Sequence, residues 1–298
     1  MRDINQIQSK NEVNITGKLI SVTPRSGKTS AGVPYESVSM VVRVDQNIEG
    51  KQQVSEIPVS IFASQFTSLG KQNPLLDNVQ RVKEMKTAQN VGIDAADTIR
   101  LTKASLQENY YIAKSGQFFD GWQIRGAFAG TGGENAKQIA SFNVEIFIID
   151  MHDEVNSEGD TTGRLIIKGG IVQYAGKLDV VEFIVEDPSK VDYLQRTLEV
   201  QNTVRVSGRI RVTSEEQETS TATSSWGEVI PDSTPRVVRE LIITGGSEGP
   251  YDEEFSYNPS DIKKAFNERK AIIEQKQVES KQGASKPAAK PTGKYDWE

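Results

Sequence analysis

The stretch "NEVNITGKLISVTPRSGKTSAGVPYESVSMVVRV", residues 11–44, decides the fold class of this protein. Its two ends alternate between apolar and polar side chains, which is the pattern of half-buried β-strands. A basic loop containing Pro24 lies between them. A phosphate-binding loop would require a glycine where Val22 stands and a helix directly after Gly27-Lys28-Thr29. The segment is therefore predicted to be a long β-hairpin, and nucleotide hydrolysis is excluded.

The amino-acid composition narrows the possible functions further. The chain has 298 residues, which is enough for two domains with cores of their own. It has no cysteine and a single histidine, His152, which excludes disulfides and multi-histidine metal sites and fits a reducing cytosol. No apolar run approaches the ~20 residues of a membrane span, and the N-terminus lacks the apolar core of a signal peptide. We expect a cytoplasmic protein.

Acidic and basic residues are segregated along the chain. The net charge of -6 by itself disfavours nucleic acid as a partner, because nucleic-acid-binding proteins carry a basic surface. Two stretches, 145–160 and 214–260, carry net charges of -6 and -8, so the remainder carries +8. The predicted strands are therefore mildly basic, and nucleic acid stays open as a partner.

The first half of the chain is predicted to form a small barrel. Residues 13–62 contain three strands, a helix follows that begins at Asn73-Pro74, and strand patterns return at 98–106 and 109–130. This order is typical of the OB fold, a five-stranded barrel whose outer face and loops bind oligonucleotides or oligosaccharides. We assign residues 1–130 to a first OB-like barrel.

The same order of elements recurs in the second half. A hairpin spans 163–187, a short helix follows at 188–200, and strands are predicted at 202–213 and 237–246. We assign residues 139–257 to a second OB-like barrel. The stretch 139–150 is an extra strand that neither barrel accommodates in this scheme.

The C-terminal region is predicted to be a helix followed by a disordered tail. Residues 258–280 begin with Asn258 as N-cap and Pro259, and carry an apolar stripe at helical spacing. Residues 281–298 have the composition of a disordered linker that ends in an aromatic and acidic tip. The fold class is therefore mainly β, with two OB-like barrels in tandem, short helices, a C-terminal amphipathic helix and a disordered tail.

No catalytic constellation is found, so we expect a protein that is not an enzyme and needs no cofactor or metal. A calcium loop starting at Glu154 has Leu165 where a bidentate glutamate is required. His152-Asp153-Glu154 matches part of a zinc-deaminase signature that also needs two cysteines, which the chain lacks. Residues 152–165 are therefore interpreted as a solvated acidic loop.

Basic and aromatic side chains of outward parity are the candidate binding residues, because single-strand binding combines a basic groove with stacking rings. In the first barrel these are Arg25, Lys28, Tyr35, Arg43, Phe62, Tyr111, Phe119 and Arg125. In the second barrel they are Arg164, Lys168, Tyr174, Arg205, Arg209 and Arg211. The alternative for the second group is an ordinary solvated strand face with cross-strand partners such as Glu182 or Glu186. Phe118, Trp122, Ile124 and Phe128 share the opposite parity and are assigned to the core.

Residues 11–44 resemble the opening of single-stranded DNA-binding proteins of bacteria and their phages, with Asn, Val and Gly in a first strand, a basic loop and an alternating second strand. The layout of barrels, Lys/Pro/Ala linker and acidic tip with an aromatic is similar to that of replication single-strand binders. The resemblance implies that the tip, Tyr295, Asp296, Trp297 and Glu298, recruits partner proteins. The terminus departs from the bacterial pattern because it has no acidic run and no final Pro-Phe. Two barrels in one chain favour a phage-encoded protein.

The hypothesis is a protein that coats single-stranded DNA in phage replication or recombination in the host cytoplasm. Its partners would be single-stranded DNA and, through the tip, replication or recombination proteins, with self-association as a further option and no membrane. The alternative is a non-enzymatic phage interaction or assembly protein that uses OB-like barrels to bind proteins. The large acidic loops favour the alternative, and the basic strands favour DNA. For the tip, the alternative is a disordered end without a role.

Overall fold

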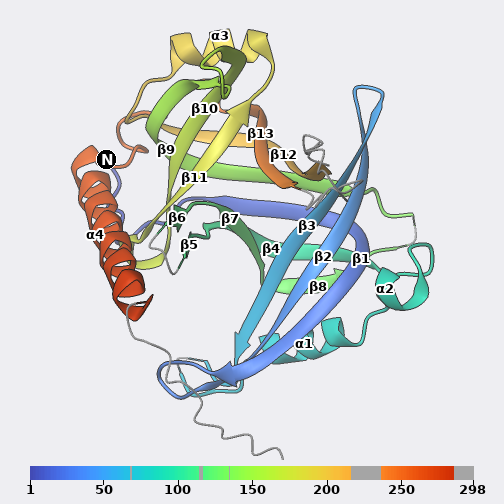
Figure 1. Ribbon diagram of the computed structural model, residues 1–298. Coiled ribbons are helices and arrows are strands. Elements are labelled where there is room, and N and C mark those ends of the chain that lie inside the picture. The colour runs from blue at the N-terminus through green and yellow to red at the C-terminus, as the bar shows by residue number, and fades with distance from the viewer. Residues whose placement is uncertain (68, 114–116, 134, 216–235, 285–298) are drawn as a thin grey trace, which may run out of the picture.

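The computed structural model describes residues 1–67, 69–113, 117–133, 135–215 and 236–284 (Figure 1). They form two β-barrels with short helices and a long C-terminal helix that lies alongside. Within this part of the chain, no helix has the length and apolar character needed to cross a membrane. The mainly β class with two OB-like barrels is confirmed.

Barrel 1 is built from the opening hairpin and the strands that follow the first helices. Its elements are β1 (Asn11–Lys28), β2 (Pro34–Ile48), β3 (Lys51–Ser64), α1 (Leu75–Lys83), α2 (Ala88–Val91), β4 (Thr98–Glu108) and β7 (Trp122–Gly126). The strands follow the order β1-β2-β3-β7-β4, and β4 pairs back onto β1. In this barrel β3 and β7 run parallel and the other pairs run antiparallel. A closed five-stranded barrel of this kind is an OB fold.

Barrel 2 repeats this plan with the same pairing pattern. Its elements are β9 (Ile139–Val155), β10 (Thr161–Val172), the 3-10 turn η1 (Tyr174–Gly176), β11 (Leu178–Val185), α3 (Pro188–Thr197), β12 (Thr203–Glu215) and β13 (Arg236–Gly246). The order is β9-β10-β11-β13-β12, closed by pairing of β12 with β9, and β11 and β13 run parallel. α3 caps this barrel at the top of Figure 1.

The stretch 139–150, which sequence analysis assigned to neither barrel, belongs to the first strand of barrel 2. Its pairing with β1 of barrel 1 joins the two barrels, and we call this pairing the seam. As part of β9 the stretch pairs antiparallel with β1, from Asn11 opposite Val144 to Thr16 opposite Ile139. The barrels therefore share one 11-stranded sheet, whose remaining strand is β8 (Phe128–Thr131), paired antiparallel with β4. The strand itself was predicted, but its place was not, because Ile146, Phe147 and Ile148 are all buried, so this part of β9 does not show which face is turned to solvent.

The two barrels are related by an internal twofold pattern. β1 bulges at Ile20, where its pairing with β2 slips by one residue, and β9 bulges at Ile149 in its pairing with β10. Counting from these bulges, Val13 and Phe142 hold equivalent positions, and they are opposite each other in the seam. A bulge marks a fixed position in a strand. Equivalent positions in the two barrels can therefore be identified from the registers.

The C-terminal helix α4 (Pro259–Ala284) confirms the predicted helix and packs beside barrel 2 and the connection between β4 and β7. The side chain of Asn258 accepts a hydrogen bond from the backbone N–H of Ser260, as an N-cap does. Ile262 and Ile273 of the predicted stripe are buried, whereas Ile272 is half-exposed. The Arg269 guanidinium forms a two-pronged ion pair with the buried Glu108 carboxylate at the end of β4.

A second buried carboxylate ties the N-terminal segment and the segment that precedes α4 to the seam strand. Glu145 of β9 is buried and accepts hydrogen bonds from the hydroxyl of Tyr257, at 2.8 Å, and from the guanidinium of Arg2, at 2.7 Å. The Arg2 guanidinium also lies 4.1 Å from the centre of the Tyr257 ring. Burial of Tyr257 raises the pKa of its phenol, and the Glu145 charge adds to this effect. The phenol therefore stays a hydrogen-bond donor.

The close approach of strands in barrel 2 requires glycine at position 208. A Cβ atom on Gly208 would lie 1.9 Å from the carbonyl oxygen of Ile242 and 2.7 Å from the Phe142 ring. Gly208→Ala would force the backbones of β12 and β13 apart, and we expect it to lower the free energy of unfolding by about 1–3 kcal/mol. Urea denaturation followed by circular dichroism measures this change.

Gly130→Ala provides the control, because a Cβ atom at Gly130 meets nothing within 4 Å. This variant should be as stable as the wild type or slightly more stable, since alanine restricts the unfolded chain. Equal stability of the two variants would contradict the close strand approach at Gly208.

Candidate nucleic-acid interface

The outer face of barrel 1 brings together three of the predicted binding residues. Tyr35 of β2 and Phe62 of β3 have ring centroids 5.0 Å apart, and the Arg125 guanidinium of β7 lies 6.0 Å from the centre of the Phe62 ring. Phe62 is 39% exposed although it is a large apolar side chain. Arg125 is also exposed and lies beside Ser60 in the parallel pairing of β3 with β7. We call these three residues the aromatic cluster.

Small hydroxyl side chains continue this face along the strands. Ser37 lies opposite Phe62, and Ser39 lies opposite Ser60, in the antiparallel pairing of β2 with β3. These serines point outward, as Tyr35 does, and their small polar side chains form a shallow surface beside the rings. Their hydroxyls can donate and accept hydrogen bonds. The serines were not selected from sequence, although their alternation with Val38 and Met40 placed them on this face.

The β1–β2 hairpin extends beyond the barrel as an arm that carries two cations. Arg25 lies opposite Ser37, and Lys28 lies opposite Pro34 near the tip. Both side chains are exposed, and neither forms an ion pair with a residue that the structure describes. Arg43, farther along β2, differs because its Nε donates to the Asp45 carboxylate at 2.9 Å. The arm therefore supplies free positive charge next to the aromatic cluster.

The connection between β4 and β7 carries a second pair of rings. It forms a hairpin of β5 (Tyr111–Ile112) and β6 (Phe118–Phe119), in which the Tyr111 and Phe119 rings stack at 6.1 Å. Tyr111 is 63% exposed and Phe119 is 46% exposed. On the other side of the hairpin, the Lys276 ammonium of α4 donates to the Tyr110 hydroxyl at 2.7 Å. The hairpin is thus held by α4 and presents its two outer rings to solvent.

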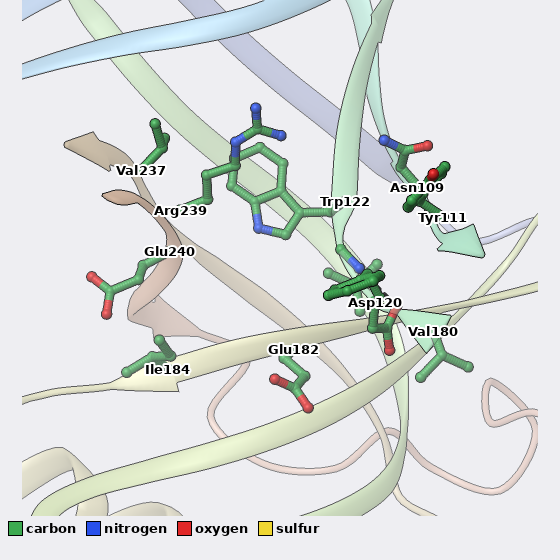
Figure 2. Close-up of a pocket in the computed structure, with 13 residues that line it drawn as sticks. Asn109, Tyr111, Asp120, Trp122, Val180, Glu182, Ile184, Val237, Arg239 and Glu240 are labelled. Carbon is green, nitrogen blue, oxygen red and sulfur yellow. Dashed lines mark hydrogen bonds between the residues drawn. The ribbon is translucent and has the colours of Figure 1, made fainter. Parts of the chain in front are cut away.

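These rings border a cleft of about 440 Å³ between the barrels (Figure 2). Trp122 lines the barrel 1 side of the cleft, and Arg239 of β13 lines the other side. Trp122 is otherwise buried, as predicted from its parity. Asp120 and Glu182 also line the cleft. Burial raises the pKa of the Asp120 carboxyl above 3.8, and the charges of Glu108 and Glu182 raise it further, against the hydrogen bond from the Gly121 N–H. The cleft is therefore acidic, unlike the face of the aromatic cluster.

The predicted basic residues of barrel 2 form a network of ion pairs. Glu186 binds Arg209 at 2.9 Å and Arg211 at 2.5 Å, while Glu240 of β13 binds Arg211 and, at 2.6 Å, Arg164 of β10. We call these five residues the arginine–glutamate lattice. Burial alone would raise the pKa of the Glu240 carboxyl, but the hydrogen bonds from Arg164 and Arg211 outweigh it and lower the pKa. For Arg164, Arg209 and Arg211, the structure therefore shows the alternative arrangement, in which each arginine has a carboxylate partner on a neighbouring strand.

The remaining predicted residues of barrel 2 lie apart from one another. Lys168 pairs with Glu182 at 3.2 Å. Tyr174 is an exposed ring in the turn η1, and Arg205 is exposed in a separate cleft with Glu145 and Tyr251. The structure does not join Tyr174 and Arg205 into one surface with the lattice. The tip residues Tyr295, Asp296, Trp297 and Glu298 lie outside the described residues.

Comparisons with known proteins give a fold likeness and a family. No curated protein matches the chain. Among solved structures, the chain is similar to the wild-type single-stranded DNA-binding protein from Thermus aquaticus, with 11% identity, a TM-score of 0.48, and coverage of 85% of this chain and 99% of that one. A deletion mutant of the same protein matches with 12% identity, a TM-score of 0.46, and coverage of 85% and 98%. The model of the YorF family matches residues 10–279, so this chain belongs to the YorF family.

Proposed function

We propose that this protein binds single-stranded DNA on the outer face of barrel 1. The observation that carries the proposal is the aromatic cluster of Tyr35, Phe62 and Arg125, three side chains from three strands of an OB barrel that meet on its exposed face. In the OB fold, the face of the second and third strands and the neighbouring loops bind oligonucleotides. Here β2 and β3 carry the rings, and the arm and the β5–β6 hairpin are the neighbouring loops.

The chemistry of this face suits an unpaired strand rather than a duplex. Exposed rings bind nucleic acid by stacking on the flat side of a base, which is accessible only when the base has left a double helix. The shallow surface of Ser39 and Ser60 leaves space beside the rings for such a base. Arg25, Lys28 and Arg125 are placed to neutralise phosphates of the same strand. All these contacts tolerate any base, so we expect binding with little sequence preference.

Removal of the exposed ring of Phe62 tests the site. Because one stacked base contributes about 1–3 kcal/mol, Phe62→Ala should weaken binding of a fluorescent single-stranded oligonucleotide by roughly 5- to 150-fold in an anisotropy titration. Phe255→Ala removes a similarly exposed ring from another surface and should leave the affinity unchanged. Equal affinities of the wild type and Phe62→Ala would contradict the proposed site.

The arm is tested by the salt dependence of binding. Each phosphate contact on a single strand contributes about 0.7 to the slope of log K against log salt concentration. The Arg25→Ala/Lys28→Ala variant should therefore flatten the slope by about 1.4 without lowering the melting temperature, since both side chains are exposed. Lys263→Ala/Lys264→Ala removes the same charge from the exposed side of α4 and should keep the wild-type slope. An unchanged slope in the arm variant would show that the arm does not contact DNA.

We also propose that binding serves phage DNA replication or recombination in the host cytoplasm, and that the tip recruits proteins of the same process. The support is the resemblance of residues 11–44 and the composition of the tail. Deletion of Tyr295–Glu298 should leave DNA affinity equal or higher and abolish capture of replication proteins from infected-cell lysate. Capture of the same proteins by the truncated chain, at the same DNA affinity, would leave the tip without this role.

A protein-binding role is the second candidate, and the acidic cleft between the barrels favours it. Asp120 and Glu182 beside the exposed Tyr111 ring suit a basic, partly apolar segment of another protein. Under this alternative, the wild type would not change the anisotropy of an oligonucleotide even at low salt. Binding of DNA that depends on Phe62 would instead favour the first candidate.

A further inference from the structure

The internal twofold pattern allows the aromatic cluster to be compared with its counterpart in barrel 2. Val42 and Ile57 are paired beside the bulge in barrel 1, and Gly169 and Val181 are paired at the same place in barrel 2. Counting along the strands from these pairs gives the counterparts of Tyr35, Phe62 and Arg125. Glu186 and Ile242 are the counterparts of Phe62 and Arg125. The count for Tyr35 ends inside the irregular part of β10, where the pairing with β9 shifts between Thr161 and Leu165, so residues 161–165 together take the place of Tyr35.

None of the three counterparts can perform the chemistry of the aromatic cluster. Residues 161–165 and Glu186 offer no ring for stacking, and Glu186 adds a negative charge at the place of an exposed phenylalanine. Ile242 is buried, so the position of the exposed Arg125 is closed to solvent. The face of barrel 2 that corresponds to the proposed site is therefore not a second copy of it.

The arginines of this face are already bound to carboxylates. The side chains of Arg164, Arg209 and Arg211 are about a quarter exposed, and Glu240 is only 11% exposed. A phosphate that approached an arginine would meet a carboxylate of the lattice at the same guanidinium, and the two anions would repel each other. Ion pairs that are partly removed from solvent are also screened weakly by salt.

The charges of the two faces differ accordingly. On the barrel 2 face, four cations are matched by four carboxylates; these residues are Arg164, Lys168, Arg209, Arg211, Glu154, Glu182, Glu186 and Glu240. On barrel 1, the cations of the arm and Arg125 form no ion pair with any residue in the described ranges. Of these two faces, the barrel 1 face therefore offers a polyanion the greater gain from counterion release.

We infer that the chain carries one nucleic-acid site rather than two, and that Glu186 and Glu240 are the residues that exclude nucleic acid from barrel 2. This inference rests on the proposed function. The two glutamates would determine which barrel binds nucleic acid, because they form ion pairs with arginines that would otherwise present a basic surface. The wild type should therefore protect the length of strand bound by a single OB barrel, about 4–16 nucleotides.

The experiment replaces both carboxylates by amides of the same shape. In Glu186→Gln/Glu240→Gln, the three arginines lose their counter-charges and become available to phosphates. We expect tighter binding of a 40-nucleotide oligonucleotide by tenfold or more, a longer footprint, and a salt slope that is steeper by up to about 2, which corresponds to three added contacts. Anisotropy titrations at several salt concentrations and nuclease footprinting measure these changes.

A matched control separates the lattice from net charge. Glu199→Gln/Glu253→Gln raises the net charge equally at two exposed glutamates outside the lattice, and it should bind like the wild type. Thermal melting checks that each variant is folded. The single variant Glu186→Gln, which removes the less buried of the two lattice carboxylates, should give an intermediate gain if the double variant is unstable.

The inference is overturned if the folded variants keep the wild-type footprint and slope, or if the control gains as much as the lattice variant. It is also overturned if the wild type already protects a strand that spans both barrels. A wrong proposed function would give a different experimental result. In that case the wild type does not bind the oligonucleotide, or its binding does not depend on Phe62.

Discussion

The antiparallel pairing of β1 with β9 is the constraint on which the rest of the structure depends. It converts two barrels into one sheet, and the apolar core continues across it, since Val13 and Phe142 belong to the same buried cluster. Backbone hydrogen bonds fix the register of this seam, and because one face of each strand is buried and the other is not, a one-residue slip would be costly. The orientation of each outer face relative to the other therefore follows from the seam.

Two buried carboxylates fix the segments that lie outside the barrels. Glu108 at the end of β4 and Glu145 in β9 are each held by an arginine from a segment outside the barrels, Arg269 and Arg2 respectively. A buried ion pair contributes little net stability, but the loss of one partner leaves a charge without compensation. These contacts therefore fix the positions of α4 and of the N-terminal segment. Through α4 they also support the β5–β6 hairpin and its exposed rings.

The sequence predicts this fold well where one face of a strand is exposed to solvent, and poorly where both faces are buried. The hairpin of residues 11–44 alternates clearly, so its strands and the outward parity of Tyr35 could be predicted. β9 was predicted as a strand but could not be placed, because residues 144–148 are all buried and do not alternate. The candidate site shows the same limit. Parity identified Arg209 and Arg211 as surface residues and Glu186 as an available partner. Glu240 lies opposite Arg211 in the antiparallel pairing of β12 with β13, and it reaches Arg164 of β10 because β11, the neighbour of β10, runs parallel to β13. Sequence spacing does not reveal a pairing between such distant segments.

The presence of both barrels in one chain removes a restriction that applies to symmetric dimers. When two identical single-barrel chains associate through their first strands, every substitution appears on both outer faces, so a stacking phenylalanine on one face is necessarily present on the other. A tandem chain has separate codons for the two equivalent positions. Phe62 and Glu186 can therefore differ, and the seam that both barrels share is unaffected by that difference. Duplication within one gene thus permits one face to keep a ligand-binding surface while the other acquires a charge-neutral one.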